Sequence, residues 1–272
     1  MFFHFDLPSG LTPVSFAALV LIMASSGLMS GLSGFGFSAI GAISLSFLPP
    51  ALAVPLLMAL STTNQLLSLR QLKADMKPLH QWWPSGPGGY ILGGALGAPI
   101  GLWLLQVLPV NALMVAFGVF LMLYAAYSLF KPAHLVLRSG NPGVSALAVG
   151  ALGGLLGGFT AFPGAAVVVW TGLKQLPKAE SRAIVQPYIL AMQLFSLVLL
   201  AVFKPASFSR EFVTLFLLLL PVVLPCTLAG TIIYKKISDF NFRRIAFLLL
   251  GSSGLGIFIK GAHAVKLMGA LI

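Results

Sequence analysis

Charged residues are scarce in this chain. Of its 272 residues, 8% are charged and 58% are hydrophobic, and the mean hydropathy is +1.01. A soluble domain usually carries about 25% charged residues, so this composition excludes a soluble fold. The apolar runs suit helices that cross roughly 30 Å of hydrocarbon, and they are too long for the strands of a barrel. The sequence therefore predicts an all-α polytopic membrane protein.

Several kinds of chemistry lack the residues that they need. Cys226 is the only cysteine, which excludes an intrachain disulfide and a thiolate cluster for a metal. The five acids and four histidines fall at predicted segment ends or in loops, so the membrane interior has no candidate for a proton relay, a metal site or a catalytic centre. No Walker A sequence is present. We therefore expect no enzyme, no cofactor and no ATP-driven pump.

Eight apolar segments can be delimited, and two are too long for one helix. The long segments, 13–48 and 143–173, each contain a glycine-rich break, and Gly-Leu-x-Gly occurs at 31–34 and again at 154–157. One broken segment followed by three spans occurs twice, which predicts two repeats, 1–134 and 135–272. The six ordinary spans are predicted at 51–69, 86–107, 110–130, 183–203, 211–234 and 244–260.

Basic residues predict how the broken segments run. The formal charge of +11 comes from Lys and Arg spread between apolar runs, which indicates membrane orientation rather than nucleic-acid binding. If each broken segment crossed the membrane once, the two sides would carry nine and seven basic residues. If each turns back at its glycines, the numbers are twelve and four, a clear cytoplasmic bias. The repeats are then inverted, both termini are extracytoplasmic, and each arm is either a re-entrant half-helix or a short full crossing.

The helix starts behind the two breaks form a candidate anion site. Non-helical backbone at membrane depth is tolerated only where it is packed in protein or lines a cavity. Ser33 or Ser38 can cap the arm after the first break, and Thr160 with Pro163 can open the arm after the second. Two such helix starts converging near the midplane would hold an anion without a buried lysine or arginine. The alternative is that the glycines only allow tight helix packing.

Polar residues of other spans extend the candidate site. Gln186 and Gln193 are seven residues apart and share a helix face, where their amides either donate to oxyanion oxygens or only join helices. Gly93, Gly97 and Gly101 recur every four residues and are interpreted as packing glycines. The predicted substrate-binding residues, which include no catalytic or metal-binding residue, are Ser33, Gly34, Phe35, Gly36, Asn64, Gln65, Gly157, Gly158, Phe159, Thr160, Gln186 and Gln193.

These motifs resemble the TauE/SafE family over nearly the whole chain. The residues that carry the resemblance are the sequences at 30–36 and 154–159, Ala179 and Arg182 after them, Gly93 with Gly97, and Phe242-Arg243. The resemblance implies a secondary transporter of sulfite, organosulfonates or related sulfur-containing anions. It also implies a bacterial inner membrane, which would place both termini in the periplasm.

Three functions follow from these expectations. The first is export of a sulfur-containing anion, because a cytoplasm negative by 100 mV favours the exit of each negative charge by about 2.3 kcal/mol. The second is import of an organosulfonate driven by a cation gradient, and the third is a membrane scaffold without transport. The expected partners are the anion and the lipid bilayer, a homodimer is an open alternative, and nucleic acid is excluded.

Overall fold

The computed structural model describes residues 10–71, 86–107 and 141–238, together with Trp82, Trp83 and isolated positions within 109–126 and 244–263. All regular structure in these residues is helical, so the predicted all-α class is confirmed. Five of their helices are long and apolar enough to cross a membrane. The predicted spans at 110–130 and 244–260 lie outside the described residues except for those isolated positions.

Each long apolar segment folds into two helical arms joined at a break. In the first, α1 (Pro13–Ser33) is followed by α2 (Gly36–Gly41) and the 3-10 helix η2 (Ala42–Ser46). In the second, α6 (Pro142–Thr160) is followed by α7 (Gly164–Leu173). The two arms of each segment pack against each other as a hairpin. The first arms have 21 and 19 residues and the second arms are shorter, so each break lies beyond the middle of its segment.

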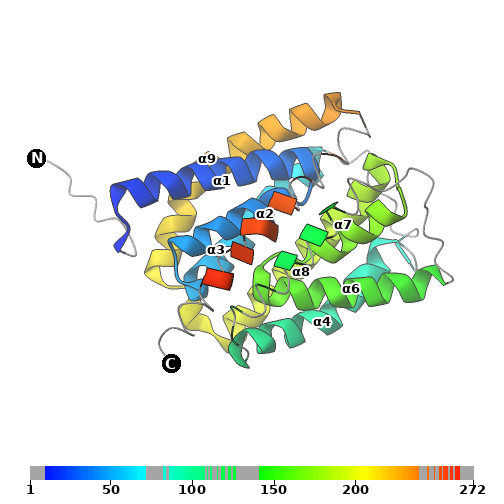
Figure 1. Cartoon of the computed structure of the whole chain (residues 1–272), viewed down its shortest axis with the longest axis horizontal. Coiled ribbons are helices and arrows are strands. Elements are labelled where there is room, and N and C mark those ends of the chain that lie inside the picture. The colour runs from blue at the N-terminus through cyan, green and yellow to red at the C-terminus, as the bar shows by residue number, and fades with distance from the viewer. Residues whose placement is uncertain are drawn as a thin grey trace, which may run out of the picture.

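The remaining helices connect and flank these hairpins. They are α3 (Pro50–Gln71), α4 (Pro87–Val107), α8 (Lys178–Phe203), the 3-10 helix η5 (Pro205–Ser207) and α9 (Arg210–Lys236). Figure 1 shows α1 beside α9 along one edge and α4 beside α6 along the opposite edge, with α2, α3, α7 and α8 between them. Helix α8 begins five residues before the predicted span at 183–203, so that Arg182 belongs to the helix.

Polar side chains set where the long helices begin. Thr12 caps α1 by accepting from the N–H of Ser15 at 3.2 Å, and Pro13 supplies the first helical residue. Asn141 caps α6 by accepting from Gly143 at 3.0 Å. Both caps precede the apolar arms directly, so the sequence itself determines where the hairpins start.

Glycines allow the edge helices to pack with their backbones in contact. Helices α1 and α9 run parallel, and a Cβ added to Gly31 would overlap the carbonyl of Thr227. Helices α4 and α6 also run parallel, and a Cβ added to Gly97 would overlap the carbonyl of Ala151. Small residues permit such close helix approach in membranes. The interpretation of Gly97 as a packing glycine therefore agrees with the structure.

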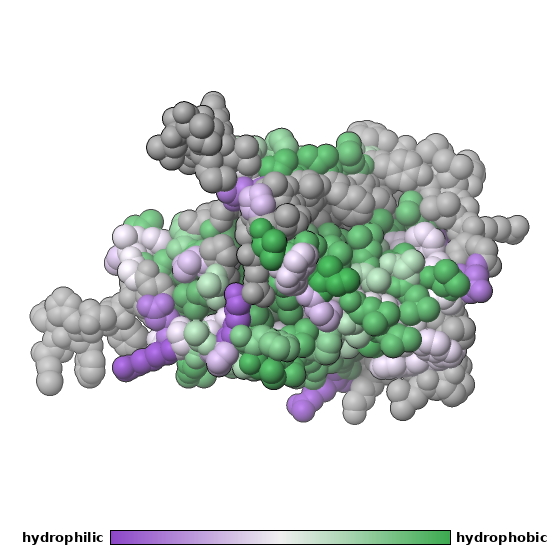
Figure 2. All heavy atoms as spheres, turned by 90° about the horizontal axis from the view of Figure 1, so that it is seen from below, coloured by the Kyte–Doolittle hydropathy of each residue, from purple (hydrophilic) through white to green (hydrophobic). Residues whose placement is uncertain are grey.

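The outer surface is apolar. Figure 2 shows hydrophobic side chains over most of the coloured part of one face. Leu96 of α4 and Leu217 of α9 are 66% and 60% exposed. An exposed apolar surface of this extent is unfavourable in water and matches the hydrocarbon of a bilayer.

Candidate functional site

The first break is closed by a serine side chain. Gly34 has a φ of 84°, a left-handed conformation in which glycine carries no Cβ penalty. The hydroxyl of Ser33 donates to the carbonyl of Met29 at 2.7 Å and accepts from the N–H groups of Phe35 at 3.3 Å and Gly36 at 3.0 Å. Of the two predicted caps, Ser33 and Ser38, Ser33 bonds the first N–H of α2, although Phe35 stands at the N-cap position without a side-chain hydrogen bond.

The second break has the same local geometry. Ala161 has a φ of 59°, and its N–H donates to the carbonyl of Gly157 at 2.9 Å. The hydroxyl of Thr160 donates to the carbonyl of Leu156 at 2.6 Å and accepts from the N–H of Phe162 at 3.2 Å. Thr160 therefore closes the second break as Ser33 closes the first, but it does not cap α7, whose N-cap is Pro163 without a side-chain hydrogen bond.

The two breaks are neighbours in the fold. A Cβ placed on Gly164, the first residue of α7, would lie 3.7 Å from the Cβ of Phe35 and 2.6 Å from Cδ1 of Ile189. Phe35 and Phe162, one from each break, belong to one buried cluster. The starts of α2 and α7 therefore lie next to each other, with Ile189 of α8 beside them.

Amide side chains of α3 and α8 meet at the first break. Gln65 donates from Nε2 to the carbonyl of Gly34 at 2.8 Å, and Gln186 donates from Nε2 to Oε1 of Gln65 at 3.1 Å. Asn64 donates from Nδ2 to the hydroxyl of Ser30 at 2.5 Å. Three of the predicted site residues, from two different helices, are thus brought together around one break.

A buried arginine holds the end of α1. Arg182 is 2% exposed and donates from Nη1 to the carbonyl of Leu32 at 3.2 Å and from Nη2 to that of Gly31 at 2.8 Å. Its guanidinium lies 4.1 Å from the ring centroid of Tyr234 in α9. The N–H groups that would extend the helix past these carbonyls bind Ser33 instead, so Arg182 supplies the missing donors at the negative end of the helix dipole.

The sequence interpretation of Arg182 was wrong. The predicted span at 183–203 left this residue outside the membrane, and the predicted anion site had no buried lysine or arginine. Helix α8 already starts at Lys178, so Arg182 lies one turn before Gln186 on the same helix face. The four-residue spacing to Gln186 was the signal in the sequence that could have located it.

The fully buried polar groups of the described residues are neutral apart from Arg182. Among the described residues, the buried polar set consists of serines, threonines, Asn64, glutamines and Arg182, without a carboxylate. A formal positive charge thus lies in the protein interior beside two neighbouring helix starts. The positive ends of the two neighbouring helix dipoles favour a negatively charged ligand.

Comparison with known proteins identifies the family. A sequence model described as Sulfite exporter TauE/SafE matches residues 19–257. The chain belongs to this family. A search of curated proteins and a search of solved structures each found no match. TauE/SafE is a transporter family, and the apolar helices of this member are those of a multi-pass membrane protein.

The remaining predicted site residues of this TauE/SafE protein do not take part in the hydrogen bonds at the first break. A Cβ on Gly157 would lie 2.6 Å from Cβ of Pro163 in its own hairpin, and one on Gly158 would lie 2.6 Å from the backbone N of Leu102 in α4. In the structure these two glycines allow close packing. Phe159 is buried in the cluster that contains Phe35 and Phe162, and Gln193 is buried in α8.

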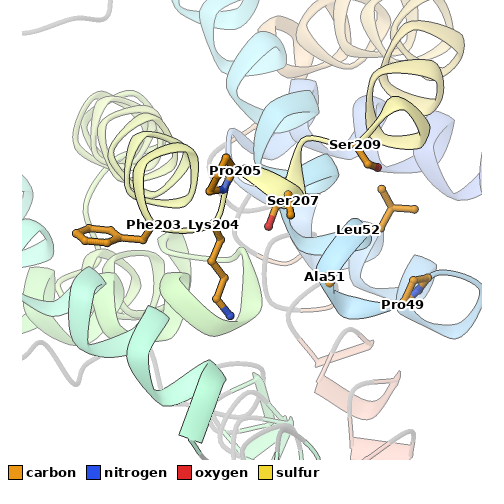
Figure 3. Close-up of a pocket in the computed structure, with 9 residues that line it drawn as sticks. Pro49, Ala51, Leu52, Phe203, Lys204, Pro205, Ser207 and Ser209 are labelled. Carbon is orange, nitrogen blue, oxygen red and sulfur yellow. The ribbon is translucent and has the colours of Figure 1, made fainter.

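A cavity opens where α8 ends and α3 begins. It has a volume of about 540 Å³. Figure 3 shows Phe203, Lys204 and Pro205 on one side of it and Ala51 and Leu52 on the other. Lys204 is the only charged residue that lines it among the described residues, so this end of the TauE/SafE protein also has a positive cavity. The full lining is Pro49, Ala51, Leu52, Phe203, Lys204, Pro205, Ala206, Ser207 and Ser209.

Proposed function

We propose that this protein is a secondary transporter that carries a small sulfur-containing anion, of the sulfite or organosulfonate class, out of the cytoplasm across a bacterial inner membrane. Membership of the sulfite exporter family supports the class of substrate. The observation that carries the proposal is the meeting of the two helix starts, since a Cβ on Gly164 would lie 3.7 Å from the Cβ of Phe35.

In this proposal the anion binds where the two breaks meet. The positive ends of α2 and α7 lie side by side around Phe35 and Gly164, and both dipoles favour a negative charge there. Arg182 binds the end of α1 with its guanidinium, so we assign it the role of raising the local potential. Direct contacts to the anion would come from backbone N–H groups and neutral amides.

The packing of the hairpins supports an alternating-access mechanism. Helix α1 of the predicted first repeat packs against α9 of the second, and α6 of the second packs against α4 of the first. We propose that the halves 1–134 and 135–272 are inverted copies that move relative to each other around the breaks. Both termini would then lie in the periplasm, in line with the excess of basic residues in the opposite loops.

The position of the cavity beside Lys204 suits one end of the transport path. It lies at the end of α8, remote along that helix from Arg182, which is near its start. We propose that this cavity is the periplasmic mouth and that Lys204 attracts the anion there. A membrane potential of 100 mV, negative inside, would favour exit of a monoanion by about 2.3 kcal/mol.

Flux measurements in proteoliposomes test the proposal. The purified protein is reconstituted, a potential is set with potassium and valinomycin, and the movement of labelled sulfite, sulfate, thiosulfate and short sulfonates is followed. We expect selective, potential-driven flux of a sulfur-containing anion. Gly164→Leu should abolish it, because the new side chain would fill the space between the two breaks, whereas Gly256→Ala should not, because no atom lies within 4 Å of its added Cβ.

The same measurement separates the alternatives. Accumulation of a sulfonate that depends on an added proton or sodium gradient would replace export by coupled import. If a well-folded preparation moves none of these anions, the transport proposal is wrong, and the scaffold function takes its place.

A further inference from the structure

We infer that Gln193 is the residue that recognises the anion, and that it selects a singly protonated oxyanion over one without a bound proton. The inference rests on the proposed transport function and adds to it the protonation state of the substrate. It starts from a difference between three buried glutamines.

Gln193 is the one of these glutamines whose amide is unused. Gln65 donates to the carbonyl of Gly34, and Gln186 donates to Gln65. Gln193 is 1% exposed, and neither its Nε2 nor its Oε1 has a hydrogen-bond partner in the part of the chain that the structure describes. Gln65 and Gln186 therefore join helices, whereas the amide of Gln193 remains available to a ligand.

Gln193 lies on α8 one turn beyond the residue that touches the second break. It lies seven residues after Gln186, which turns it to the same face of α8 about 10 Å further along the helix. Ile189, one turn before Gln193, touches the first residue of α7 at Gly164. Gln186 is thus next to the first break, and Gln193 continues the same face past the meeting point of α2 and α7.

A buried amide without a hydrogen-bond partner lowers the stability of the folded protein. We therefore expect that a ligand supplies the partner. Leaving a buried donor or acceptor unsatisfied costs about 1–3 kcal/mol per group, and most buried polar groups in folded proteins are bonded. A glutamine that only filled space would be less stable than leucine at this position. A ligand that enters the site would satisfy both groups of Gln193.

The amide dictates the chemistry of that ligand. Nε2 offers hydrogen-bond donors, and Oε1, on the same carbon, offers an acceptor. An oxyanion without a proton has acceptors only, so its oxygen would repel Oε1. A monoanion with one protonated oxygen, such as hydrogensulfite, can accept from Nε2 and donate from its O–H to Oε1 at the same time. Methanesulfonate has the same charge and no O–H, which makes it the matched comparison.

The test compares these two anions in wild-type and Gln193→Leu proteoliposomes at several pH values. We expect the wild-type protein to have a KM for hydrogensulfite at least about tenfold lower than for methanesulfonate. At constant total sulfite, its flux should fall as pH rises and the O–H is lost. Gln193→Leu should raise the KM for hydrogensulfite about 10- to 100-fold and remove the preference between the anions.

Stability provides the second readout. Gln193→Leu should melt at or above the temperature of the wild type, because it removes an unsatisfied amide, whereas Gln186→Leu should melt lower because it breaks a bond to Gln65. Val198→Ala, at an exposed position of the same helix, is the control for flux.

The outcomes are distinct. An unchanged KM and preference in Gln193→Leu, or a wild-type protein that prefers methanesulfonate, overturns the role of Gln193 and leaves transport standing. Unchanged kinetics would mean that a buried water satisfies the amide. No flux of either anion from the wild-type protein overturns the proposed function and this inference together.

Discussion

Replacement of Arg182 tests whether its guanidinium stabilises the end of α1 at the first break. In Arg182→Met the side chain keeps an apolar stem of similar length and loses the guanidinium. The carbonyls of Gly31 and Leu32 then lose the donors at 2.8 Å and 3.2 Å. Both carbonyls are buried, and Ser33 already occupies the N–H groups that would otherwise reach them.

The magnitude follows from these contacts. Two unsatisfied buried carbonyls cost about 2–6 kcal/mol together, and the lost contact with the ring of Tyr234 adds about 0.5–2 kcal/mol. Removing a buried cation recovers several kcal/mol of desolvation. We therefore expect a net loss of about 2–4 kcal/mol in the free energy of unfolding for Arg182→Met. Arg182→Lys should lose less, because the charge remains while the planar fork is lost.

The assay is the melting temperature of detergent-purified protein, followed by the fraction that stays monodisperse after heating. Arg210→Met is the control, because Arg210 is exposed at the start of α9 and surface substitutions usually change stability by less than about 0.5 kcal/mol. The expected order of stability is wild type and Arg210→Met, then Arg182→Lys, then Arg182→Met. If Arg182→Met melts together with Arg210→Met, the guanidinium does not hold the end of α1.

Three further substitutions test the packing and the polar contacts. Gly97→Val should lower stability by at least about 1–3 kcal/mol, since its Cβ would overlap backbone atoms of α6; an unchanged melting temperature, as expected for Gly256→Ala, would contradict this contact. Gly34→Ala should cost about 1–2 kcal/mol because of its φ of 84°, and no loss on thermal melting would show that the left-handed turn is not required. A double-mutant cycle with Gln65→Leu and Gln186→Leu should give a coupling of about 0.5–3 kcal/mol from the bond at 3.1 Å; additive effects would argue against that bond.

Local features of the break could be predicted from the sequence. Ser33 and Thr160 were candidate caps because a hydroxyl next to a helix start bonds N–H groups two or three residues ahead. Both hydroxyls form such bonds inside the breaks, but only that of Ser33 reaches the first residue of the following helix. The sequence did not show correctly which residue of the second break corresponds to Gly34. The motif Gly-Leu-x-Gly pairs Gly34 with Gly157, whereas the geometry pairs Gly34 with Ala161, one helical turn later. A glycine in the sequence marks a possible left-handed turn, whereas the alanine at this position gives no such indication.

The pairing of distant segments could not be predicted. The contacts of α1 with α9 and of α4 with α6 join residues far apart in the chain, and glycine spacing indicates a packing face without naming its partner. Gln65 and Gln186 were both candidate site residues, but only the crossing of α3 and α8 shows that they bond to each other. The division into repeats 1–134 and 135–272 and the homodimer stay predictions.

By itself the sequence determined the membrane class, the two breaks and the family, because hydropathy and glycine content act over a few neighbouring residues. Tertiary structure alone decided that Arg182 is buried, that the two breaks touch at Phe35 and Gly164, and that Gln193 lacks the partner that Gln186 has. Those properties depend on which helices lie against each other. The arrangement of the helices sets a side chain's burial and its hydrogen-bond partners. That arrangement cannot be recognised from a few neighbouring residues of the sequence.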